Sequence, residues 1–134
     1  MKPFETLTVS GKEYNLKITM GEMVKLEAKI GSDLLTGMEK LTAATTLAEY
    51  YFAALKPWND SISTIEDVYQ LFDDYITQGG TYEELQHKMV EVLVLSGIMS
   101  QKAFEISQKA LAKQKEALEK LMTDNGDADM SILS

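Results

Sequence analysis

The stretch from Tyr14 to Gly31 constrains the fold most, because a strand signal is followed directly by a helix signal. Apolar and polar residues alternate over 13–18, the period of a strand with one face in a core. Thr19 is followed three residues later by Glu22, which predicts a capping box at the start of a helix. Gly31 predicts a left-handed stop, so the helix spans 20–30. Its apolar residues, expected on one side, are Met20, Met23, Val24, Leu26 and Ile30.

Glu27 falls inside the apolar arc of this helix, which covers roughly 160° of the helical wheel. A carboxylate on the packing face either extends past its neighbours to solvent or makes an internal contact that the fold or a partner needs. The sequence leaves both interpretations open. Glu27 is therefore the first candidate partner-binding residue.

The remaining chain predicts a mostly helical α+β fold. Two strands around Gly11 form a hairpin over 4–18, which must lie on helices because two strands alone are marginal. Helical patterns continue after Ile30, with further capping boxes predicted at Ser63 with Glu66 and at Thr81 with Glu84. The valine-rich run that follows favours a helix, with a strand as the alternative.

We expect a β-hairpin packed on a bundle of about five to six helices. Residues 1–122 form one α+β domain, made of the hairpin 4–18, a helical body 20–100 and a polar helix 101–122. The tail 123–134 is rich in acids and turn formers and is predicted to be disordered.

Composition argues against several functional classes. The chain has a net charge of −8 and all 13 basic residues are lysines, which disfavours nucleic-acid binding. It lacks cysteine, and its only histidine, His87, has no convergent carboxylates that the sequence can place. No apolar run approaches the ~20 residues that span a bilayer. We therefore predict no catalytic residue, no cofactor, no metal and no membrane partner, in a cytoplasmic setting.

Two further features suggest binding to a protein partner. The aromatics 50–52 are consecutive on a predicted helix, so they either fill a helix sandwiched between neighbours or include one that faces a partner. Phe104, Leu111 and Leu118 recur every seven residues and can dock on the domain, pair with another helix or receive a client. The candidate partner-binding residues are Glu27, Tyr50, Phe52, Phe104, Leu111 and Leu118.

Over residues 4–100 the order of elements resembles the tail assembly chaperones of siphophages and prophages of low-GC Gram-positive bacteria. The residues that carry the resemblance are Tyr14, Leu26, Glu27, Gly31 and Gly97. The resemblance implies a non-enzymatic protein of the host cytoplasm that binds the tape measure protein and keeps it soluble. The tail tube protein then polymerises around that client, and the chaperone is absent from the mature virion.

The same resemblance implies a longer, frameshifted form of the chain as a second partner, and self-association is compatible with it. Two other functional classes remain open. One is a structural tail or head–tail connector protein that assembles into rings and stays in the particle. The other is an acidic regulatory or inhibitor protein of a mobile element.

Overall fold

The computed structural model describes residues 2–100, 102, 103, 105, 106, 109, 113, 116, 117, 119 and 120. The chain divides into two units at Ser100. In the second unit the described residues are helical. Phe104, Leu111, Leu118 and the tail 123–134 lie outside the described residues, so the predictions made for them stay predictions.

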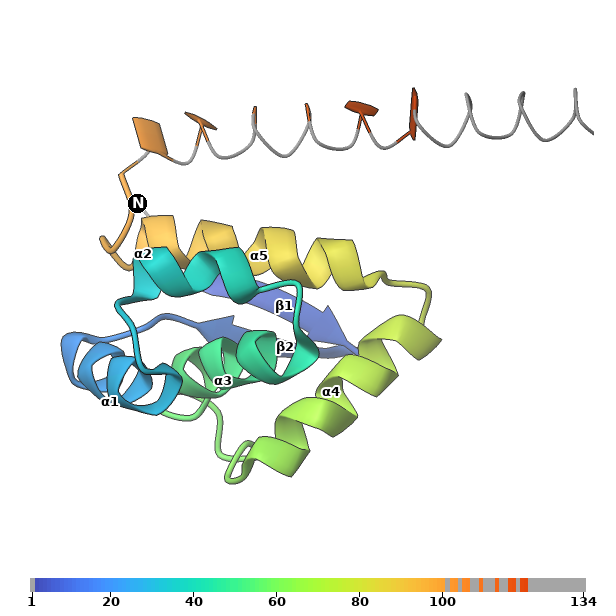
Figure 1. Ribbon diagram of the computed structural model, residues 1–134. Helices are drawn as coiled ribbons and strands as arrows, with labels where there is room; N and C mark the ends of the chain where they lie inside the picture. The colour runs from blue at the N-terminus through green and yellow to red at the C-terminus, as the bar shows by residue number, and fades with distance from the viewer. Residues whose placement is uncertain are drawn as a thin grey trace, which may run out of the picture. The chain divides into compact units, whose positions relative to one another are not determined.

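The first unit is an antiparallel β-hairpin followed by five α-helices packed together, so the predicted mostly helical α+β class is confirmed (Figure 1). A 3₁₀ turn, η1, continues the shortest helix. The elements are β1 (Glu5–Val9), β2 (Lys12–Leu16), α1 (Met20–Ile30), α2 (Leu34–Gly37), η1 (Met38–Lys40), α3 (Ala44–Leu55), α4 (Ile65–Thr77) and α5 (Tyr82–Leu95).

The hairpin turn is set by two residues in the left-handed conformation. Val9 pairs with Lys12, which leaves Ser10 and Gly11 as a two-residue loop with φ of 52° and 79°. Positive φ at both positions matches the right-handed twist of the flanking strands. Gly11 adopts this conformation without the steric cost of a side chain.

Both outer edges of the hairpin are held by side-chain amides. Asn59, after α3, accepts a hydrogen bond from the Asn15 N–H (3.1 Å) and donates one to the Asn15 carbonyl (2.8 Å). On β1, Gln78 accepts from the Ser10 N–H (2.8 Å) and donates to the Thr8 carbonyl (2.9 Å). Each amide supplies the donor and the acceptor that a neighbouring strand would supply.

Helix α3 is the centre of the core and contacts α1, α4, α5 and β2. Tyr50 and Tyr51 are fully buried on it. The Tyr50 hydroxyl donates to the Leu34 carbonyl (2.7 Å), and the Tyr51 hydroxyl donates to the Leu85 carbonyl (2.6 Å). The Tyr51 ring also packs edge-on against Phe72 of α4, at 5.0 Å between ring centroids. Through these contacts α3 connects α2 with α4 and α5.

The predicted helix starts and stops are largely confirmed. The Thr19 hydroxyl accepts the N–H of Glu22 (3.3 Å), and Thr81 forms a capping box with Glu84. The run 90–95 is helical, so the strand alternative is wrong. The physical reason is that the cap and the helical spacing continue into this run without a break.

The predicted capping box of α4 is displaced by one residue. The N-cap is Thr64 and not Ser63, and the third helical residue that serves it is Asp67 and not Glu66. The Asp67 carboxylate accepts the N–H groups of Ser63 (2.8 Å) and Thr64 (2.9 Å). These hydrogen bonds favour the ionised form and hold the pKa of Asp67 below its ordinary value.

On α1 and α4 the apolar residues extend beyond the face of the helix that the fold covers. On α1, Leu26 is buried, whereas Met20 and Val24 are 73% and 59% exposed. On α4, Tyr69 and Ile76 are 44% and 48% exposed. The residues buried on α4 are Val68, Leu71 and Phe72. Each helix is covered from one side only, so part of its apolar arc stays on the surface.

Candidate functional site

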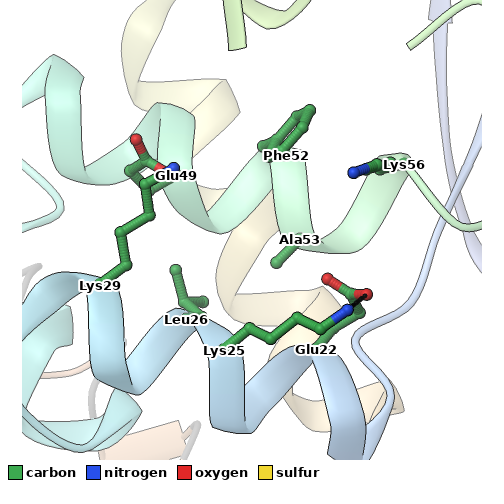
Figure 2. Close-up of a pocket in the computed structure, with 8 residues that line it drawn as sticks. All are labelled: Glu22, Lys25, Leu26, Lys29, Glu49, Phe52, Ala53 and Lys56. Carbon is green, nitrogen blue, oxygen red and sulfur yellow. Dashed lines mark hydrogen bonds and ion pairs between the residues drawn. The ribbon is translucent and has the colours of Figure 1, made fainter. Parts of the chain in front are cut away.

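A groove between α1 and α3 combines an apolar floor with a charged rim (Figure 2). Leu26 and Ala53 form the buried floor, and Phe52 is half-buried beside them. The complete lining is Glu22, Lys25, Leu26 and Lys29 from α1, with Glu49, Phe52, Ala53 and Lys56 from α3 and its C-cap. On each helix the four residues follow the spacing of three, four and seven that marks one helical face.

Two lysines of the rim lie near the ring of one aromatic side chain, Phe52. Lys29 and Lys56 place their Nζ atoms 5.9 Å and 5.3 Å from the Phe52 ring centroid, within reach of a cation–π interaction. Lys29 also forms an ion pair with Glu49 (3.0 Å). Lys56 makes no ion pair with any residue that the structure describes, so it can accept a carboxylate from outside.

The size of the groove indicates what it can hold. Its volume is about 170 Å³, below the roughly 300–1,000 Å³ of typical small-molecule sites. Open on one side and lined along two helices, it suits one large apolar side chain of a segment lying across it. The arrangement offers apolar contact at the floor and charged side chains at the rim.

The three consecutive aromatic residues of α3 lie in different environments. Tyr51 and Tyr50 lie in the core, and only Phe52 reaches the surface. The prediction that Tyr50 contacts a partner is at odds with this burial, whose physical reason is that α3 is packed on several sides. Phe52, predicted with it, lies in the groove.

Glu27 lies at the edge of the core and outside the groove. It is half-buried, and its carboxylate makes no hydrogen bond or ion pair with a described residue. Its negative charge acts on Tyr50. Burial of Tyr50 is the largest cause that raises the pKa of this side chain, and the negative charges of Asp33 and Glu27 add to it, so that the pKa reaches about 12. Of the two interpretations of Glu27, the one in which it extends past its neighbours fits this position.

Sequence reasoning missed most of the groove. The sequence prediction does not single out Lys29, Glu49 or Lys56, although Glu22, Lys25, Leu26 and Lys29 repeat the spacing of Glu49, Phe52, Ala53 and Lys56. That shared pattern was visible in the sequence. Which two helix faces would meet was not.

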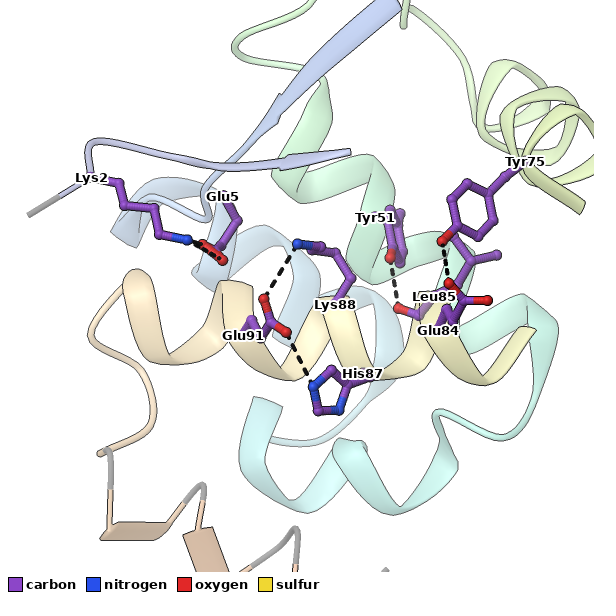
Figure 3. Close-up of polar contacts among 9 residues, drawn as sticks. All are labelled: Lys2, Glu5, Tyr51, Tyr75, Glu84, Leu85, His87, Lys88 and Glu91. Atoms are coloured by element: carbon purple, nitrogen blue, oxygen red, sulfur yellow. Dashed lines mark hydrogen bonds and ion pairs between the residues drawn. The ribbon is translucent and has the colours of Figure 1, made fainter. Parts of the chain in front are cut away.

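A second polar cluster lies between the N-terminal segment and α5 and is internally paired (Figure 3). Lys2 bonds the buried Glu5 (2.8 Å), and Glu91 pairs with His87 (3.1 Å) and Lys88 (3.3 Å). Burial opposes the charged form of Glu5, but hydrogen bonds and the two lysines outweigh it and hold the pKa of Glu5 below its ordinary value. Each of these ion pairs lies within one segment, and the two segments that carry them, β1 and α5, contact each other.

Within the described residues, no group of three or more His, Cys, Asp or Glu side chains is arranged to hold a metal ion. The helices in that part of the chain are too short or too polar to cross a bilayer. Comparison of the chain with protein-family models, curated proteins and solved structures found no match.

Proposed function

We propose that this protein is a tail assembly chaperone that binds the helical tape measure protein and keeps it soluble until the tail tube assembles. The observation that carries the proposal is the α1–α3 groove, which has an apolar floor at Leu26 and Ala53 with Phe52 beside them, and a rim where Lys56 has no ion-pair partner among the described residues. It agrees with the resemblance over residues 4–100. The role is binding and not catalysis.

The chemistry of the groove matches what a long helical client requires. An apolar side chain of the client covers Phe52, and polar residues of the same helix meet the charged rim. Each contact is small, so a single copy binds weakly. Several copies along one client then hold it through multivalency.

The test is co-expression with the tape measure protein encoded nearby, followed by affinity purification and light scattering. We expect a soluble complex with several copies of the chain per client. A chain that leaves the client insoluble and assembles alone into a ring would contradict the proposal and point to a structural tail component.

Two variants test whether the groove is the surface that contacts the client. Phe52→Ala removes the aromatic surface of the groove and should reduce the yield of the soluble complex. Val24→Ala is the matched control, because Val24 is exposed on α1 but does not line the groove. Equal yields from both variants would remove the groove from the client-binding surface.

A further inference from the structure

The lysines of the first unit are concentrated at the α1–α3 groove. Residues 2–100 contain eight lysines and fifteen acidic residues, which gives their side chains a net charge of −7. Three of these lysines line the groove, together with two of the acids, so the groove itself carries a net charge of +1. A carboxylate of a partner is therefore repelled over most of this unit and attracted at the groove.

Two of the three groove lysines already have ion-pair partners inside the groove. Lys25 pairs with Glu22 (3.5 Å), and Lys29 pairs with Glu49 (3.0 Å). The third lysine, Lys56, is exposed and makes no ion pair with a described residue. A carboxylate from outside can therefore pair with Lys56 without breaking an existing ion pair.

Lys56 lies beside the largest apolar side chain of the groove. Its Nζ atom is 5.3 Å from the centroid of the Phe52 ring, and Figure 2 shows the lysine directed toward that ring. A carboxylate bound to Lys56 therefore lies close to any apolar side chain that covers Phe52. On a helix, residues three or four positions apart have Cβ atoms about 5–6 Å apart, which matches this separation. One face of an amphipathic helix can meet both groups at once.

We propose that Lys56 selects, among the helical segments of the client, those that carry a carboxylate three or four residues from a large apolar side chain. This inference rests on the proposed function, because it names the kind of client segment that the groove binds. A segment with a lysine at the same place puts two like charges opposite each other and binds less well. Phe52 supplies the contact area, and Lys56 determines the specificity.

The first test uses three synthetic helical peptides, each with one leucine to face the groove. The residues four positions before and after that leucine are glutamates, glutamines or lysines. Amide chemical shifts of the isotope-labelled full-length chain, followed at Leu26 and Phe52, give the dissociation constants. We expect the glutamate peptide to bind about tenfold more tightly than the lysine peptide at low salt, and added salt to reduce the difference. Equal constants, or peptides that leave these signals unchanged, would overturn the proposal.

Charge reversal assigns the preference to one side chain. Lys56→Glu should reverse the order, so that the lysine peptide binds most tightly. Lys56→Gln removes the charge without adding the opposite one and should reduce the difference between the peptides. Lys40→Glu is the matched control, because Lys40 is exposed and does not line the groove, and it should keep the wild-type order. Circular dichroism verifies the fold of each variant, and a wild-type order that survives in folded Lys56→Glu would refute the proposal.

The tape measure protein separates a failure of this inference from a failure of the proposed function. Lys56→Glu should lower the yield of the soluble complex. An unchanged yield would leave the chaperone function standing and remove the selection by Lys56. If the wild-type chain does not hold the tape measure protein, the proposed function fails, while the peptide order still tests Lys56 by itself. Peptide affinity that falls as the protein concentration rises would mean that a second copy covers the groove, which would also overturn the proposal.

Discussion

The hydrogen bonds of Asn59 make the sharpest stability prediction. Asn59 is 9% exposed, and its side chain makes three hydrogen bonds: one from the Asn15 N–H, one to the Asn15 carbonyl, and one to the Leu55 carbonyl at 2.8 Å. Asn59→Ala removes all three and leaves the half-buried N–H and carbonyl of Asn15 without their side-chain partner, whereas the Leu55 carbonyl keeps the N–H groups of Trp58 and Asn59. At about 0.5–1.5 kcal/mol for each bond, we expect a loss of about 2–4 kcal/mol in the free energy of unfolding.

Gln78→Ala is the matched control. Gln78 makes the equivalent pair of contacts on β1, but it is exposed, so water can satisfy the groups that its removal frees. We expect it to cost below about 1 kcal/mol. Urea unfolding, followed by the fluorescence of Trp58 and independently by circular dichroism, measures both variants.

A third variant tests the direction of each hydrogen bond. Asn59→Asp keeps an acceptor for the Asn15 N–H but turns a carboxylate oxygen toward two carbonyl oxygens. The folded state then disfavours the charged form, which raises the pKa of the introduced carboxyl. Its stability relative to the wild type should recover as the pH falls through that raised pKa. The reasoning fails if Asn59→Ala unfolds within about 0.5 kcal/mol of the wild type, or if Gln78→Ala costs as much.

Four further substitutions test other parts of the same unit. Gly80→Ala would drive a methyl group into the Tyr75 ring and should lower the free energy of unfolding by about 1–3 kcal/mol. Gly21→Ala meets no neighbour and should stabilise α1 by up to about 1 kcal/mol, and thermal unfolding compares the two variants. Glu5→Gln should lower stability at neutral pH, with the gap closing as the pH falls through the lowered pKa of Glu5; a gap that persists in acid would contradict this. Tyr51→Phe removes the hydroxyl that donates to the Leu85 carbonyl in the core and should cost about 1–2 kcal/mol in urea unfolding, and an unchanged midpoint would exclude a role for that bond.

Local signals predicted the secondary structure well because they act within a few residues. The turn at Gly11, the stop at Gly31 and the cap at Thr81 each depend on neighbouring backbone groups that the chain itself supplies. The one displaced cap shows the limit of this reasoning. Ser63 with Glu66 and Thr64 with Asp67 are equally good capping pairs in sequence, and the path of the loop before α4 selected the second.

The sequence by itself determined the fold class, the order of the elements and the residues able to enter a core, because these follow from spacing and capping along the chain. Only the tertiary structure decided which part of each apolar arc is covered. It buried Tyr50, left Met20, Tyr69 and Ile76 exposed, and brought two lysines to Phe52. The physical reason is that periodicity gives the width of a helix face, whereas burial depends on how many neighbours reach that face. A binding surface is the part that they leave uncovered.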